Sequence, residues 1–389
     1  MRSPFPRRIA GLVATIALVA VACLRGDQTA WLGAPKTIAP GIELYQTTDM
    51  TLVDPQGPIA AYLLRLDLDR VQIEAALSNE EVMDAERVDS IAQRRQAIAA
   101  VNAGFFNVKN GEPVGLLKVA GELVGDNTLT RGAVAVHTPP GSRQQLYFDQ
   151  AAAKMEARYK VGAQSSTVAI DGVDTTRERG KLMLYSPMYH ADTDTANNGT
   201  EWVLTGSPLK VTDVRRDLGK TPIPRDGFVL SFGGLEPPSP LDWLLPGTEV
   251  RFVTNWKILN GTSAERFEEA RDILNGAGLL VRDGTPLSNW TATEGLQAAT
   301  FVDVRHPRTL IGVDRRGYVW LVAIDGRQPS HSVGMTFTEL IALCRRLDLD
   351  NALNLDGGGS TTMVVRGEVV NRPADRVERR VSDGLFVLP

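Results

Sequence analysis

Cysteine and histidine are both scarce in this sequence. Its 389 residues include two cysteines and four histidines. Two cysteines cannot supply a disulfide framework, and Cys344 falls on the apolar face of a predicted helix. The histidines are scattered, without the spacing of a zinc site, so we predict neither a bound metal nor another cofactor. Stability must therefore come from an ordinary hydrophobic core.

The sequence also lacks a strong charge of either sign. It carries 42 basic and 46 acidic residues, a formal net charge of −4, and no basic stripe. Because binding to nucleic acid depends on clustered Lys and Arg that neutralise phosphates, a nucleic-acid partner is excluded. With 43% apolar residues, 23% charged residues and 36 glycines, the composition is that of a globular, loop-rich protein that contains β-sheet.

The hydrophobic run near the N-terminus is too short to span a bilayer comfortably. Residues 9–22 follow a stretch with three arginines and end in small residues, the pattern of a signal peptide. We expect residues 1–22 to be that signal, 23–41 a linker and 42–389 a single domain, so the protein is exported, to the periplasm, the envelope or the medium. An alternative is lipid attachment at Cys23, which would hold the protein to a membrane.

Apolar patterning indicates strands and a helix in the first third of the chain. Alternation predicts strands over 59–68 and 71–77, and helical spacing predicts a helix over 88–96 followed by a strand at 97–101. The region 111–289 shows many short strand patterns separated by turn signals. Within it, the polar stretch 185–200 is expected to form a long surface loop at the functional site.

The C-terminal third has the clearest pattern. Thr336 and Glu339 form a capping box that opens a helix with one apolar face. A strand before this helix and a strand after it make a βαβ unit. We therefore expect an α+β fold of mixed β-sheets with packed helices, including this C-terminal βαβ unit. The strands are expected at 309–313, 317–324, 351–355, 361–365 and 369–370.

Two carboxylates close the strands of the predicted βαβ unit. Asp325 and Asp356 each follow the last apolar residue of a strand. Parallel strands end at the same edge of a sheet, where ligands of open sheets bind. If the two strands are immediate neighbours, the carboxyl groups lie roughly 5 to 10 Å apart, the range used by retaining and inverting glycosidases. This pair predicts glycosidic chemistry.

Arginines and a glycine run lie next to these acids. Arg308 and Arg327 can bind phosphate oxygens bidentately, so an anionic substrate is indicated. The glycines 357–359 allow backbone conformations closed to other residues and can expose N–H groups, while Ser360 and Thr361 add hydroxyls. The run is followed by a strand and lacks the Gly-Lys-Ser/Thr ending of a phosphate loop, so nucleotide binding is disfavoured.

Each of these features also has an ordinary structural interpretation. Asp-Gly is a common turn, and an isolated arginine is more often a solvated surface residue than a ligand. A serine hydrolase would use Ser360 with His306 or His331 as its base, but no spacing specifies such a partner and the nucleophile-elbow motif is absent. The three consecutive glycines followed by hydroxyl residues are the hardest to explain as structure alone.

Five motifs stand out when the sequence is taken in order: Ala100 to Asn107, His306 to Gly312, Asp325 to Arg327, Asn354 to Met363 and Val369 to Pro373. They resemble the successive motifs of the phosphodiester glycosidase family, and the likeness extends from about residue 42 to 388. The resemblance implies cleavage of a sugar-1-phosphate bond in a phosphodiester by an exported enzyme of mixed α and β structure. Bacterial relatives suggest a role in envelope or exopolysaccharide glycan metabolism, with a glycan or glycosyl phosphodiester as the partner.

The resemblance also implies a set of site residues. Asp325 and Asp356 are expected to be catalytic, as the acid and the nucleophile or base, although a phosphate leaving group needs little protonation and one carboxylate could be structural. The remaining polar motif positions are expected to bind sugar or phosphate oxygens. These positions are Asn102, Arg308, Arg327, Gly358, Ser360, Thr361 and Asn371.

Two other functions compete with this hypothesis. One is a non-catalytic glycan-binding envelope protein with the same fold; the other is an ordinary glycosidase that acts on uncharged glycans. Two acids and two arginines at one predicted site favour the phosphodiester glycosidase, because a lectin seldom needs such a set of charges.

Overall fold

The computed structural model describes residues 29–126 and 129–389, and they are mostly β-structure. The expected α+β class with packed helices is wrong: the longest α-helix described has ten residues, and curled sheets make up most of the structure. Helix patterns in the sequence are real but local, whereas the sheets bury most of the apolar side chains. The α-helices are α1 (Val88–Arg94), α2 (Ala264–Glu268), α3 (Trp290–Glu294) and α4 (Phe337–Arg346).

The largest sheet has eight strands in the order β1-β2-β3-β21-β20-β22-β18-β19. Tyr45, Leu63 and Trp320 are among its buried residues on the face that α4 covers. The strands are β1 (Lys36–Ala39), β2 (Ile42–Thr47), β3 (Ala61–Leu66), β18 (Leu279–Arg282), β19 (Thr285–Pro286), β20 (Arg308–Asp314), β21 (Val319–Ile324) and β22 (Leu349–Asn354).

A five-stranded sheet, in the order β24-β23-β5-β25-β4, packs against the opposite face. Leu64 and Leu321 of the large sheet share one core with Val101 and Leu385 of the smaller one. Layers of sheet on sheet therefore form the body of the protein. The strands of the smaller sheet are β4 (Gln72–Leu77), β5 (Ala99–Asn102), β23 (Met363–Val365), β24 (Glu368–Val369) and β25 (Asp383–Leu388).

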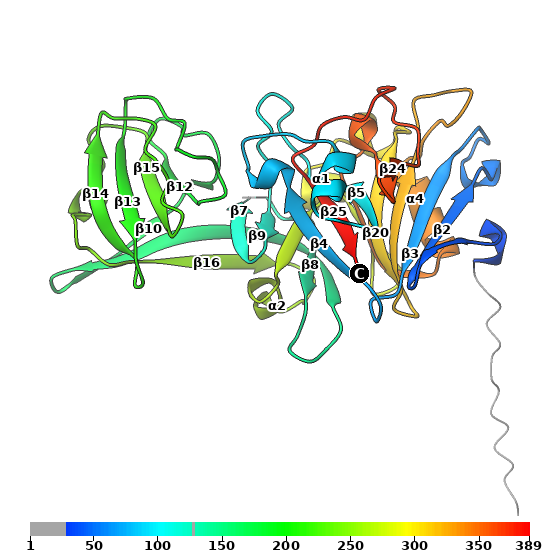
Figure 1. The fold of residues 1–389 in the computed structure, drawn as a ribbon, viewed down its shortest axis with the longest axis horizontal. Helices are drawn as coiled ribbons and strands as arrows, with labels where there is room; N and C mark the ends of the chain where they lie inside the picture. Colours follow the sequence, from blue (N-terminus) through cyan, green and yellow to red (C-terminus); the bar gives the residue numbers. More distant parts are fainter. Residues whose placement is uncertain (1–28, 127–128) are drawn as a thin grey trace, which may run out of the picture.

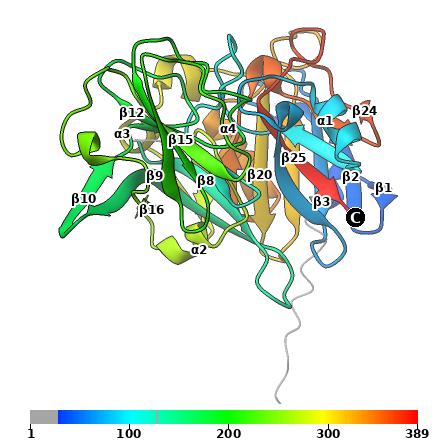
Figure 2. The same cartoon turned by 60° about the vertical axis from the view of Figure 1, so that its left-hand side comes forward.

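The third sheet extends from the body and carries a second lobe (Figure 1). Strand β9 is 17 residues long, and β16 pairs with its residues 151–159. The far end of this ribbon packs on the lobe, because Tyr159 of β9 shares a core with Trp202 and Leu230; Figure 2 shows the same arrangement with the lobe turned forward. The strands are β6 (Leu117–Val119), β7 (Glu122–Gly125), β8 (Arg131–His137), β9 (Gln145–Val161), β10 (Gln164–Ala169), β16 (Val250–Ile258) and β17 (Asp272–Asn275).

The second lobe is a five-stranded sheet in the order β11-β12-β15-β13-β14. It occupies the central part, residues 172–232, of the middle region that the sequence predicts to be short strands. Buried Trp202 anchors it by donating its indole N–H to the Leu244 carbonyl at 3.0 Å. The strands are β11 (Gly172–Val173), β12 (Leu182–Tyr185), β13 (Thr200–Thr205), β14 (Lys210–Arg216) and β15 (Gly227–Phe232).

The C-terminal βαβ connection is present, but its strands are not neighbours. Helix α4 joins β21 to β22, and β20 lies between them, antiparallel to both. The two flanking strands consequently run in the same direction and end at the same edge. The predicted capping box is confirmed, since Thr336 Oγ1 accepts from Glu339 N at 3.2 Å and Glu339 Oε2 accepts from Thr336 N at 2.9 Å.

The expected signal peptide 1–22 and the lipid site at Cys23 lie outside the described residues. Part of the predicted linker is ordered, because Lys36–Ala39 forms the edge strand β1. Among the residues that the structure describes, no helix has the length and apolar character to cross a membrane.

Candidate active site

Three of the sequence motifs meet at one edge of the large sheet. Strands β21 and β22 end there and β20 begins there, so residues 325–327, 356–360 and 306–309 become neighbours. Leu355 N donates to Thr309 O at 2.8 Å, and Gly358 N donates to Pro307 O at 2.9 Å. The start of β20 therefore bridges the two strand ends that carry the predicted acids.

Asn102 brings the second sheet to the same place. This residue is fully buried at the end of β5, and its Nδ2 donates to the Asp356 carbonyl at 2.7 Å. Its Oδ1 accepts from Thr309 Oγ1 at 2.8 Å and from Thr362 N at 3.1 Å. Both ends of the amide are thus engaged within the protein, and Asn102 holds the glycine loop between the two sheets.

Two guanidinium groups cover the glycine loop. Gly358 has a φ of 62°, and a Cβ added there would lie 3.2 Å from Arg327 Nη2. A Cβ at Gly359 would collide with Arg379 and Asp375, which form an ion pair at 2.6 Å above it. The missing side chains let both arginines approach the loop closely. Gly357 and Gly358 use their own N–H groups inside the protein, so positive charge at this loop comes from the arginines.

Asp356 is a half-buried carboxyl group at the start of this loop. Burial, with a smaller contribution from the nearby Asp383, raises its pKa to about 7. The Ser360 hydroxyl, the Gly357 N–H at 2.8 Å and Arg379 oppose this increase. A carboxyl group with this pKa is partly protonated at neutral pH and can either give or take a proton.

Asp383 and Arg379 are site residues that the sequence did not identify. Asp383 is fully buried at the start of β25 and accepts from Gly104 N at 2.6 Å and Ser382 Oγ at 2.5 Å. Burial raises its pKa as well. Asp383 sits in an ordinary Asp-Gly turn pattern, and no local pattern marks Arg379. Only long-range strand pairing brings these two residues to Asp356.

Asp325 is almost fully buried, and its carboxylate is surrounded by donors. Its Oδ1 accepts from Asn371 Nδ2 at 2.9 Å, and both oxygens accept from Arg372 N, at 3.1 and 3.0 Å. Its Oδ2 contacts His331 Nε2 at 2.8 Å, and the His331 side chain is 27% exposed. Asp325 itself is buried, and its contact with the partly exposed His331 can hold that imidazole ring in one orientation.

Asn371 links this pair to the glycine loop. Its Nδ2 also donates to Thr361 O at 3.0 Å, and its Oδ1 accepts from Met363 N at 2.7 Å. The buried Thr361 hydroxyl has no hydrogen-bond partner within the described chain. Buried hydroxyl groups without a protein partner are expected to bind water or ligand.

Arg308 is buried behind the sheet edge where the three motifs meet. Its Nε donates to Met335 O at 2.9 Å, and its Nη2 donates to Phe301 O at 2.6 Å and Val304 O at 3.0 Å. The guanidinium also lies 4.8 Å from the centre of the Phe337 ring. Burial lowers the pKa of Arg308 to about 9, helped by Arg327. These contacts fix Arg308 as part of the wall of the site.

His306 lies between Arg327 and the preceding loop. Its Nε2 contacts Thr300 O at 2.9 Å, and its Nδ1 lies 3.1 Å from Arg327 Nη2. Burial lowers the pKa of His306, and Arg308 and Arg327 lower it further. A neutral ring that donates from Nε2 and accepts at Nδ1 satisfies both contacts, so His306 orients Arg327.

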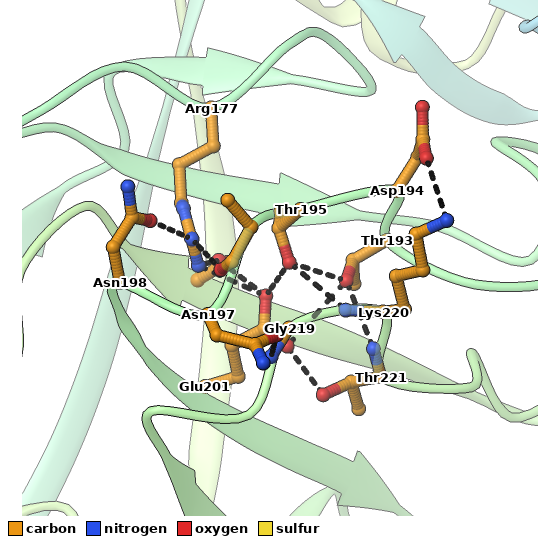
Figure 3. Close-up of polar contacts among 12 residues, drawn as sticks. Arg177, Thr193, Asp194, Thr195, Asn197, Asn198, Glu201, Gly219, Lys220 and Thr221 are labelled. Atoms are coloured by element: carbon orange, nitrogen blue, oxygen red, sulfur yellow. Dashed lines mark hydrogen bonds and ion pairs between the residues drawn. The ribbon is translucent and has the colours of Figure 1, made fainter.

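The polar stretch 185–200 packs on the second lobe. Figure 3 shows Thr193 and Thr195 of this stretch directed at Glu201, together with Arg177 and Thr221. Glu201 is fully buried and accepts from Thr195 Oγ1 at 2.8 Å, with Arg177 Nη1 at 3.2 Å. The expected surface loop is therefore fastened by a buried ion pair.

The described part of the chain contains no group of three His, Cys, Asp or Glu residues placed to hold a metal ion.

Comparisons with known proteins relate the chain to one family. Residues 203–388 match the family described as phosphodiester glycosidase. An N-acetylglucosamine-1-phosphodiester alpha-N-acetylglucosaminidase from Bos taurus is 32% identical over 124 residues, which are 28% of this chain and 23% of that relative. The corresponding Homo sapiens protein is 34% identical over 113 residues, 27% of this chain and 22% of the relative. The chain thus spans less than a quarter of the curated relatives it matches.

A solved structure of a hypothetical protein from Synechocystis has the same fold. It matches with a TM-score of 0.74 at 22% identity and covers 90% of this chain and 62% of its own. The matched residues of this chain, 203–388, include every strand that carries a residue of the candidate site except β5 of the second sheet.

Proposed function

Through residues 203–388 the chain belongs to the phosphodiester glycosidase family, and we propose that it is a hydrolase that cleaves the sugar-1-phosphate bond of a glycosyl phosphodiester. One observation carries the proposal: Asp356 begins a glycine loop, with Arg327 next to Gly358 and Arg379 next to Gly359. Guanidinium groups bind phosphate oxygens in fixed geometry, and a carboxyl group beside them can act on the glycosidic oxygen.

In this proposal the two arginines hold the phosphate. Arg327 is held by His306, and Arg379 by Asp375 at 2.6 Å. The phosphate displaces Asp375 or shares Arg379 with it. As the bond between the sugar carbon and the phosphate oxygen breaks, the leaving phosphate gains negative charge, which both guanidinium groups stabilise.

Asp356 and His331 divide the proton transfers. The protonated fraction of Asp356 donates to the departing phosphate oxygen, while a water molecule attacks the sugar carbon and loses its proton to His331. Asp325 orients His331 and stabilises its protonated form, so Asp325 is a positioning residue. Asn371 and Asn102 keep the strand ends in register with the loop.

The test is hydrolysis of UDP-N-acetylglucosamine by the purified protein and by Asp356→Asn and Asp325→Asn variants. We expect the first substitution to reduce kcat by about 10² to 10⁴. The Asp325→Asn substitution should reduce kcat less, because the proposed base, His331, is itself retained. Asp283→Asn is the matched control, since Asp283 lies in a turn with its side chain 72% exposed.

Unchanged activity in both site variants would exclude the proposed mechanism. If a broad panel of glycosyl phosphodiesters gives no turnover while glycans bind measurably, the non-catalytic glycan-binding function is favoured instead.

We also propose that the protein is exported and acts on envelope or exopolysaccharide glycans. The support is the signal pattern in residues 1–22. Cell fractionation and the mass of the mature N-terminus test it: a chain that begins at Met1 in the cytoplasm contradicts export, and a lipid mass on Cys23 establishes membrane attachment.

A further inference from the structure

Two phenylalanines lie beside the candidate active site, and the chemistry proposed above does not use them. Phe105 and Phe301 are half-buried, and their ring centres lie 6.2 Å apart in an edge-to-face arrangement. Phe105 belongs to the motif Ala100 to Asn107, and Phe301 lies in the π-helical turn Ala298–Val302. Single π-helical turns are frequent at functional sites, and aromatic rings commonly line ligand sites.

Hydrogen bonds place Phe105 next to the start of the glycine loop. Asp356 N donates to Ala103 O at 2.8 Å, two residues before Phe105. Between them, Gly104 N donates to the Asp383 carboxylate at 2.6 Å, and a Cβ at Gly104 would collide with that carboxylate. The chain therefore passes beside both acids immediately before it reaches Phe105.

Phe105 is the outer end of a column of aromatic side chains. Phe301 packs on Phe337 with ring centres 5.5 Å apart, and Phe337 packs on Trp290 at 5.0 Å. Phe337 and Trp290 are buried, so the column runs outward from the core. Arg308 donates to Phe301 O at 2.6 Å, and its guanidinium lies 5.0 Å from the centre of the Phe301 ring. A ring supported in this way loses little conformational freedom when a ligand covers it.

The charged groups set the direction in which a substrate extends from the loop. Arg327 lies next to Gly358 and Arg379 next to Gly359, whereas Phe105 lies near Asp356 at the start of the loop. A phosphate held by the two arginines therefore directs the attached sugar past Asp356 and toward Phe105. A pyranose ring has a face of C–H groups, which can pack on an aromatic ring.

We propose that Phe105, supported by Phe301, is the platform on which the sugar ring of the substrate packs. The inference rests on the proposed function, because it assigns the sugar side of the bond on which Asp356 acts. It also gives Arg308 a positioning role, through Phe301, in place of the substrate contact that the sequence predicts.

The test compares binding of UDP-N-acetylglucosamine with binding of UDP, which has the phosphates but lacks the sugar. Calorimetric titration of the Asp356→Asn variant slows hydrolysis during the measurement. In this background we expect UDP-N-acetylglucosamine to bind more tightly than UDP. Phe105→Leu should raise the Kd of UDP-N-acetylglucosamine about tenfold and leave the Kd of UDP unchanged. Phe105→Tyr keeps the ring and should retain the affinity.

Phe106→Leu is the matched control, because Phe106 adjoins Phe105 but packs with Val88 and Phe386 in a different core cluster. Phe301→Leu keeps the test valid if Phe105→Leu misfolds. It removes the support of the platform, and should weaken UDP-N-acetylglucosamine by a smaller factor without affecting UDP.

Equal weakening of both ligands by Phe105→Leu, or equal or absent binding of the two ligands to the background protein, would overturn the inference. An effect of Phe106→Leu as large as that of Phe105→Leu would also overturn it. Turnover by the wild-type protein tests the proposed function separately. If no glycosyl phosphodiester is hydrolysed but sugar-dependent binding is lost in Phe105→Leu, the platform stands and the hydrolase proposal fails. If hydrolysis occurs and Phe105→Leu keeps sugar-dependent binding, the platform alone fails.

Discussion

At the scale of single residues, protonation of Asp356 controls the proposed chemistry. Burial raises its pKa to about 7, and Arg379 acts in the opposite direction. If protonated Asp356 is the acid, kcat/KM should fall as the pH rises through about 7. Removing Arg379 removes a positive charge that favours the carboxylate, so the pKa of Asp356 should rise and activity should persist to higher pH.

The measurement is the pH dependence of kcat/KM for the wild-type protein and Arg379→Ala. The loss of a phosphate ligand lowers the whole profile, but only a change in the pKa of the acid moves its alkaline limb upward. Arg376→Ala, an exposed change in the same segment, is the control. An alkaline limb that stays in place in Arg379→Ala would assign the acid to another group.

At this scale the sequence predicts candidate residues but not their surroundings. Asp325, Asp356 and Arg327 can be singled out because each ends a strand pattern or lies next to a glycine. Their contacts cannot be predicted in this way, since the burial of Asp325 and its contact with His331 depend on Asn371 and Arg372, which follow 46 and 47 residues later. No pattern within a strand encodes such distances.

At the scale of elements, the glycine loop lacks side chains, and this leaves room for Arg327 and Arg379. Gly359 does not have a positive φ, and the three atoms nearest to an added Cβ belong to the side chains of Arg379 and Asp375. We expect Gly359→Ala to push these half-exposed side chains aside and reduce kcat/KM at least about tenfold, with a loss of stability below about 1 kcal/mol. Steady-state kinetics and thermal unfolding together measure this.

An equal loss of activity and folding in Gly359→Ala would mean that the loop is needed for structure alone. Asp375→Ala is the companion variant. It frees Arg379 without filling the space above Gly359, so activity should be retained.

Element prediction was accurate where patterns are local. The capping box and the hairpin before it form as expected, and Cys344 is buried on α4. The relation between elements was not predictable in the same way: β20 is inserted between β21 and β22, because it pairs with both. A strand's second partner lies outside any local window, and for this reason the fold class was also wrong.

At the scale of the whole molecule, the second lobe depends on a buried ion pair. Arg177 and Glu201 lie together in the lobe (Figure 3). Their side chains are 4% and 0% exposed, and Ser231 Oγ donates to the Glu201 carboxylate at 2.7 Å. The lobe also contacts the body, where Thr176 Oγ1 donates to Glu112 Oε1 at 2.7 Å. The lobe and the catalytic mouth therefore have separate polar supports.

This separation predicts that the lobe can be weakened on its own. Glu201→Gln removes the charge that balances Arg177 and one acceptor for the surrounding hydroxyls, and should destabilise the lobe by about 3 kcal/mol. Hydrogen exchange should then accelerate in β12, β13 and β15 while β20 and β22 stay protected. Activity on UDP-N-acetylglucosamine should persist. Uniform acceleration of exchange in all sheets would instead show that lobe and body unfold as one cooperative unit.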